Sequence, residues 1–200
     1  MSESTAHIVD DDAAIRDALS WLLRSRGVSA QCWASGEAFL AGLSPEMRGC
    51  IVLDVRMDGI SGIEVHEQLV GRGCRMPVIF LTGHGDVPLA VAALKKGAFD
   101  FVEKPFNDNQ LVDRVIEAMR SDEALRQELE AEASIAARLA QLTAREREVM
   151  DRVLAGDHNK AIAEELDIAI RTVEVHRAHV FEKMGVRSAV ELAGLLSHRR

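Results

Sequence analysis

The stretch Gly49-Cys50-Ile51-Val52-Leu53-Asp54-Val55-Arg56 decides the fold class of this chain. A short apolar run between turn-forming residues is typical of a strand buried on both faces of a parallel sheet. In open parallel sheets, ligands bind beyond the carboxyl ends of the strands, where loops carry polar groups on a rigid base. The run ends in Asp54, which makes this carboxylate a candidate site residue. The alternative is a turn residue or a helix cap, as an isolated aspartate at a strand end usually is.

Three further apolar runs end in a polar group. They are His7–Val9 before Asp10, Asp11 and Asp12, Val78–Leu81 before Thr82, and Phe101–Glu103 before Lys104. A less regular strand is expected at 28–33. Amphipathic helices are expected between and after the strands, at 13–26, 35–43, 63–70, 87–96 and 107–119. Strand and helix alternate five times, which predicts an α/β fold with a doubly wound, five-stranded parallel sheet.

The composition is that of a folded chain of one or two domains. It has 200 residues, of which 48% are hydrophobic, and this fraction permits a core. No apolar run is long enough to span a bilayer, and the N-terminus lacks a secretory pattern, so we expect a cytoplasmic protein without a membrane partner. The odd number of cysteines, 3, argues against a disulfide framework.

The rest of the chain predicts a helical spacer and a small all-α domain. Residues 121–141 contain neither Gly nor Pro and read as an acidic helix, either a solvated spacer, which we favour, or a short coiled-coil seam. Four short helices are expected at 143–155, 159–166, 171–184 and 188–196. A tight turn between the second and third predicts a helix-turn-helix. The expected domains are therefore 1–120, 121–141 and 142–200.

The strand ends of the first domain predict an acidic pocket. On a parallel sheet Asp10, Asp11 and Asp54 would converge, and three close carboxylates repel one another unless a cation lies between them. Hard oxygen ligands suit Mg²⁺ or Mn²⁺. Lys104 can pair with a phosphoryl group, and an aspartate beside Mg²⁺ is a competent nucleophile for phosphoryl transfer.

These motifs resemble the receiver domain of bacterial two-component response regulators. The resemblance rests on Val9-Asp10-Asp11, Leu53-Asp54, Phe101–Phe106 and Thr82–Pro88, the last of which is particularly similar to the FixJ group. Residues 159–187 resemble the LuxR/NarL-type DNA-binding domain, so the two matches together leave only the spacer uncovered.

The resemblance implies a role for each pocket residue. Asp54 would accept phosphate from the phosphohistidine of a sensor kinase. Asp11, Asp54 and the backbone carbonyl of Arg56 would hold the metal, with Asp10 assisting. Lys104 would pair with the phosphate, and Thr82 with Phe101 would report it as a switch. The family also implies promoter DNA, a homodimer formed on phosphorylation and RNA polymerase as partners.

One position departs from the family pattern. Family members usually have Pro after the Met that corresponds to Met57, and this chain has Asp58. Losing Pro frees the backbone φ angle, restores an N–H donor and adds a negative charge near the pocket. We therefore expect a change in loop stiffness and in phosphoryl lifetime.

The third helix of the last domain carries the expected DNA contacts. If Val173, Val180 and Met184 face inward, polar side chains on the other face reach bases and phosphates. The candidates on this helix are Arg171, Thr172, Glu174, Val175, His176, Arg177 and Lys183, and Lys160 at the start of the preceding helix is a further one.

Two other classes of function compete with that of a transcription regulator. An aspartyl-phosphate phosphatase also has an acidic Mg²⁺ pocket, but such enzymes commonly carry a second Asp where this chain has Arg56. An adaptor that binds only proteins would leave Lys160, Arg171 and Lys183 without a role. We therefore expect no enzyme activity beyond phosphoryl transfer to Asp54 and its autodephosphorylation.

Overall fold

A computed structural model describes residues 4–83 and 87–197, apart from the side chains of 87–90. The chain divides into two compact units, Met1–Arg126 and Gln127–Arg200. The first contains a five-stranded parallel sheet of order β2-β1-β3-β4-β5. Its strands are β1 (Thr5–Val9), β2 (Ala30–Trp33), β3 (Gly49–Asp54), β4 (Val78–Thr82) and β5 (Asp100–Glu103). The predicted doubly wound sheet is confirmed.

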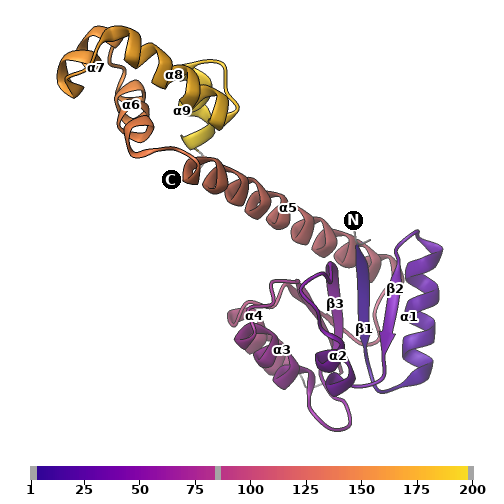
Figure 1. The fold of residues 1–200 in the computed structure, drawn as a ribbon. Helices are drawn as coiled ribbons and strands as arrows, with labels where there is room; N and C mark the ends of the chain where they lie inside the picture. The colour runs from indigo at the N-terminus through magenta and orange to yellow at the C-terminus, as the bar shows by residue number, and fades with distance from the viewer. Residues whose placement is uncertain (1–3, 84–86, 198–200) are drawn as a thin grey trace. The chain divides into compact units, whose positions relative to one another are not determined.

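Helices cover both faces of this sheet (Figure 1). On one face, α1 (Ala13–Ser25) and the start of α5 (Asp108–Ala140) pack apolar side chains against the strands. On the other face lie α2 (Gly36–Gly42), α3 (Gly62–Gly71) and α4 (Val87–Lys95). The central strand β3 is buried at all its positions, as a strand covered on both faces must be. The loop predicted at 83–86 lies outside the described residues beyond Gly83.

Glycine is required where α3 begins. A Cβ on Gly62 would lie 2.1 Å from the carbonyl oxygen of Asp54, so only glycine lets the helix start this close to the end of β3. Ser61 caps the helix in a capping box with Glu64. The loop from Asp54 to α3 is therefore short and closely packed.

The last helix of the first unit differs from the prediction. Residues 107–119 and 121–141 were expected as a domain helix and a separate spacer, whereas α5 runs unbroken from Asp108 to Ala140. No Gly or Pro interrupts it. Asp122 on this helix accepts a hydrogen bond from the N–H of Gly49 (2.9 Å), so packing against the sheet continues past residue 120. The boundaries after 120 and 141 stay predictions.

The second unit adds four short helices, α6 (Ala144–Ala155), α7 (Asn159–Leu166), α8 (Ile170–Met184) and α9 (Ala189–Ser197). Thr143 and Glu146 form the predicted capping box of α6. Asp167 ends α7 in the left-handed conformation (φ 51°), which makes the tight turn into α8. Val173, Val180 and Met184 are buried as expected. Nowhere in 4–83 or 87–197 is a helix both long and apolar enough to cross a bilayer.

Candidate functional site

The three predicted carboxylates meet at the carboxyl edge of the sheet. β1 and β3 are neighbours, and Val9 pairs with Leu53, so the residues that follow, Asp10 and Asp54, lie side by side. Asp10, Asp11 and Asp54 each offer a carboxylate oxygen, and these oxygens all lie within 4.8 Å of one another. Asp10 and Asp54 are buried and Asp11 is exposed. The sequence predicted this convergence, and the structure confirms it.

Lys104 neutralises the buried part of this cluster. Its ammonium lies 2.6 Å from Asp54 Oδ1 and 3.1 Å from Asp10 Oδ2. It is carried by the loop after β5, whose backbone is fixed because the Lys104 N–H donates to the Thr82 carbonyl (2.7 Å). A single cation thus bridges two carboxylates at the point where a phosphoryl group on Asp54 would project.

The pKa values of this pair are both raised. Burial is the largest effect on the pKa of Asp54 and raises it, as does the charge of Asp10, whereas the hydrogen bond and charge of Lys104 act to lower it. Burial would lower the pKa of Lys104, but hydrogen bonds and charges from Asp54 and Asp10 raise it. Lys104 therefore stays a cation, and its charge and hydrogen bond favour the anionic form of the Asp54 carboxylate.

Main-chain donors fix the other carboxylate oxygens. Asp54 Oδ2 accepts from the N–H of Arg56 (3.1 Å), and Asp10 Oδ1 accepts from that of Asp12 (2.9 Å). Asp11 Oδ2 accepts from the N–H of Asp58 (2.8 Å). This last bond comes from the position where the family pattern has Pro, so the donor restored by losing Pro is in use.

The residue types and distances fit a hard divalent cation. Three carboxylate oxygens within 4.8 Å could share one ion, and Mg²⁺ is usually bound by one or two carboxylates and several waters. The cluster is partly exposed through Asp11, which leaves room for such waters. Ligation by the Arg56 carbonyl stays a prediction.

The two predicted switch residues lie on neighbouring strands. Thr82 is fully buried at the end of β4, and its hydroxyl donates to the Gly83 carbonyl (3.1 Å). Phe101 is partly buried on β5, where it pairs in register with Phe80. Both are placed where a change at the carboxyl edge of the sheet can reach them. Their role in switching stays a prediction.

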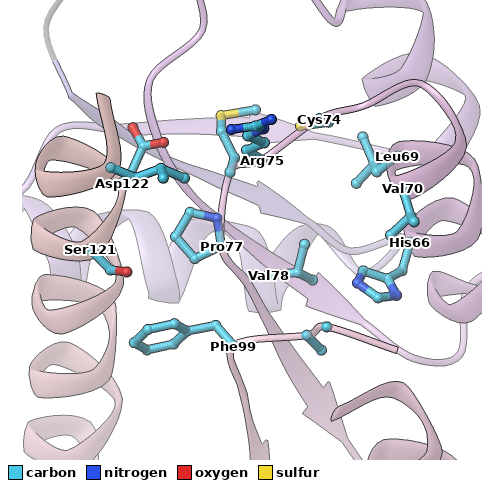
Figure 2. Close-up of a pocket in the computed structure, with 14 residues that line it drawn as sticks. His66, Leu69, Val70, Cys74, Arg75, Pro77, Val78, Phe99, Ser121 and Asp122 are labelled. Carbon is cyan, nitrogen blue, oxygen red and sulfur yellow. The ribbon is translucent and has the colours of Figure 1, made fainter. Parts of the chain in front are cut away.

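A cavity lies at the opposite end of the sheet from the acidic cluster (Figure 2). This cavity of about 380 Å³ is bordered by α3, the residues before β4 and α5. Figure 2 shows His66, Cys74 and Asp122 around it. Asp122 already pairs with Arg126 (2.9 Å), and burial raises the pKa of the Cys74 thiol and lowers that of His66. The acidic cluster of Asp10, Asp11 and Asp54 lies at the other edge of the sheet.

In the second unit, the outer face of α8 is open as predicted. Arg171, Thr172 and Glu174 are exposed, and the Val175 side chain is 48% exposed. Lys160 on α7 is also exposed. The geometry suits a helix whose N-terminal turns meet a groove of DNA.

Two of the remaining three candidates on α8, Lys183 and Arg177, have contacts within the unit. The Lys183 ammonium lies 2.6 Å from Glu146 Oε2, which is buried. The Arg177 guanidinium lies over the Phe181 ring, 5.6 Å from its centroid. His176 is half-buried, and its Nδ1 has no hydrogen-bond partner among the described residues. DNA contacts by these three stay predictions, and the Lys183 ion pair is one that sequence reasoning missed.

Two family models match this chain. One is the response regulator receiver domain, over residues 6–116, and the other is the bacterial regulatory proteins of the luxR family, over 140–196. The fold and the acidic edge define the class of two-component response regulators. The chain belongs to the branch of this family that joins a receiver to a LuxR-type DNA-binding domain, as transcriptional regulators rather than classical enzymes.

Full-length relatives support this assignment. The C4-dicarboxylate transport transcriptional regulatory protein DctR of Rhodobacter capsulatus is 53% identical, over 94% of this chain and 97% of its own. The transcriptional regulatory protein FixJ of Bradyrhizobium diazoefficiens is 46% identical, over 94% and 92%. The structure of the response regulator StyR has a TM-score of 0.92 at 39% identity, covering 98% and 99%. The predicted family and fold are confirmed, and a sensor kinase and DNA follow as partners.

Proposed function

We propose that this chain receives a phosphoryl group on Asp54 from the phosphohistidine of a sensor kinase and then binds promoter DNA. The observation that carries the proposal is the Asp54 carboxylate itself. It is 7% exposed, lies at a strand end, and has an ammonium at 2.6 Å and two carboxylates beside it. This is a setting in which an aspartate can be a nucleophile.

The transfer uses groups of this chain. An Asp54 carboxylate oxygen attacks the phosphorus, the bond from phosphorus to the histidine nitrogen breaks, and its electron pair returns to the histidine. Lys104 pairs with the negative charge of the incoming group. Asp10, Asp11, Asp54 and the Arg56 carbonyl would hold Mg²⁺ or Mn²⁺, which supplies charge neutralisation when bound. Water later hydrolyses the acyl phosphate and restores Asp54.

Phosphorylation of Asp54 then changes the conformation of the surface formed by α4, β5 and α5. The phosphoryl oxygens offer the Thr82 hydroxyl new acceptors, and Phe101 rotates inward into the space that Thr82 leaves. We propose that two receivers pair through this surface in the cytoplasm. Pairing sets two α8 helices at half-sites about 34 Å apart, where RNA polymerase is a further partner.

The DNA contacts divide into two kinds. Lys160, Arg171, Thr172, Arg177 and Lys183 are proposed to hold phosphates, with Arg171 and Arg177 also able to reach guanine. Glu174 and Val175 are proposed to face the edges of the bases, and His176 to lie beside the sugar-phosphate backbone of the DNA. Support comes from the exposure of the N-terminal half of α8.

The nucleophile is tested by mass spectrometry of the intact chain after incubation with acetyl phosphate and Mg²⁺. The unmodified chain should gain one phosphoryl group. Asp54→Asn should gain none, because an amide cannot act as an anionic nucleophile. Equal incorporation in Asp54→Asn at a comparable rate would mean that another residue is the acceptor.

A further inference from the structure

The loop after β3 reaches the exposed carboxylate of the acidic cluster, Asp11, through a main-chain group. Asp58 is four residues beyond Asp54, and its N–H donates to Asp11 Oδ2 at 2.8 Å. A proline at this position would have no N–H to give. The bond therefore depends on the departure from the family pattern at residue 58.

The same loop is fixed on either side of Asp58. The N–H of Arg56 donates to Asp54 Oδ2 (3.1 Å), and that of Ile60 donates to Glu37 Oε1 (3.0 Å). Gly62 then donates to the Val55 carbonyl (3.0 Å), which closes the loop. Because the loop is held on both sides of residue 58, the direction of the Asp58 N–H is fixed. This N–H can therefore orient the Asp11 carboxylate to which it donates.

Asp11 is the carboxylate of the cluster with the greatest need of orientation. Asp10 and Asp54 are buried and paired with Lys104, whereas Asp11 is exposed. An exposed aspartate samples several rotamers unless a neighbour holds it. A carboxylate that accepts one hydrogen bond keeps lone pairs for a cation, so the bond to Asp58 leaves Asp11 able to be a ligand.

We propose that Asp58 is a positioning residue for the divalent cation, through its main-chain N–H and not through its side chain. The N–H orients the Asp11 carboxylate and couples the loop after Asp54 to the cation site. In metal sites, groups that hydrogen-bond a ligating side chain from outside typically change affinity about 10–100-fold when lost. This inference rests on the proposed function of the pocket.

The test is a matched pair of variants of the full chain, Asp58→Pro and Asp58→Ala. Both lack the carboxylate side chain, and only Asp58→Pro also lacks the N–H. Isothermal titration with Mg²⁺ should give about tenfold weaker binding for Asp58→Pro than for Asp58→Ala. Equal or tighter binding by a folded Asp58→Pro would overturn the proposal.

A second measurement does not need proline. In the unmodified chain, NMR should find the Asp58 amide protected from exchange and shifted by Mg²⁺ with the midpoint that calorimetry gives. Asp11→Ala should raise the exchange rate of this amide at least tenfold. An exchange rate that Asp11→Ala leaves unchanged would overturn the proposal even if Asp58→Pro fails to fold.

The cation site and the role of Asp58 can be tested separately. If the unmodified chain binds no Mg²⁺, the proposed cation site is wrong, and this inference falls with it. If the unmodified chain binds Mg²⁺ and is phosphorylated on Asp54, but Asp58→Pro and Asp58→Ala bind the cation alike, only the role of Asp58 is wrong.

Discussion

Glu146 illustrates how a single buried charge can hold the second unit together. Its carboxylate accepts hydrogen bonds from Lys183 Nζ (2.6 Å) and from the Thr143 N–H (2.8 Å). It thus joins the start of α6 to the end of α8. The Lys183 hydrogen bond is the largest of several effects that lower the pKa of Glu146, from 4.5 to about 2.

This lowered pKa gives a stability prediction with a definite sign. A carboxyl whose pKa is lower in the folded state stabilises above its unfolded pKa, and this contribution is lost as the pH falls from about 4.5 towards 2. Glu146→Gln should therefore lower the free energy of unfolding at pH 7, by about 1–3 kcal/mol. The difference from the unmodified chain should narrow below pH 4.5.

Urea unfolding followed by circular dichroism measures this difference. The fluorescence of Trp21 and Trp33, the two tryptophans of the chain, reports the first unit and serves as the control. A difference that stays constant between pH 7 and pH 3 would contradict the assigned role of Glu146.

At the scale of an element, the DNA contacts proposed for α7 and α8 divide into base contacts and phosphate contacts. Glu174 is exposed on the outer face of α8. Glu174→Ala should change which base pair is preferred at one position, by roughly 1–3 kcal/mol if the carboxylate accepts from cytosine N4. Selection from a randomised DNA library gives the preference of both proteins, and identical preferences would exclude Glu174 as a reader.

Lys160 on α7 is proposed to contact a DNA phosphate. Its side chain is 79% exposed and lies 3.9 Å from Glu164, a weak surface pair. Lys160→Ala should weaken binding to every DNA sequence alike. It should also reduce the magnitude of the slope of log K against log salt by about 1, because a protein that makes one phosphate contact fewer releases fewer counterions on binding. An unchanged salt slope would contradict a phosphate contact.

Lys183→Ala is the matched comparison for Lys160→Ala. Because the Lys183 ammonium is paired with Glu146, its removal should lower stability as well as any DNA affinity. A loss of affinity with unchanged stability would instead favour a direct phosphate contact by Lys183.

The periodicity of apolar residues predicted the strands and helices. The expected parallel sheet predicted which polar side chains lie together at its carboxyl edge. Asp10, Asp54 and Lys104 were predicted because each follows an apolar run of one parallel sheet. The sequence did not predict that α5 is one unbroken helix. An apolar stripe indicates a helix, but it does not show whether two successive helical segments are continuous. The Asp58 bond to Asp11 and the Lys183 bond to Glu146 depend on tertiary distances that spacing does not encode.

At the scale of the whole molecule, the proposal links phosphorylation to association. A beryllofluoride adduct on Asp54 should convert a monomer to a dimer, because Thr82 and Phe101 then reshape the α4–β5–α5 surface. Light scattering with and without beryllofluoride measures the mass. A dimer of unchanged stability in both conditions would instead favour permanent pairing through α5 or through Leu192, Leu195 and Leu196.

The link between phosphorylation of Asp54 and DNA binding is tested by the DNA affinity of the full chain with and without a phosphodonor. Gel shifts on genomic DNA fragments, with acetyl phosphate and Mg²⁺ present or absent, compare the unmodified chain with Asp54→Asn. The unmodified chain should bind DNA more tightly when the phosphodonor is added, and the affinity of Asp54→Asn should not change. Equal binding by the unmodified chain in both conditions, or the same gain in Asp54→Asn, would contradict this link.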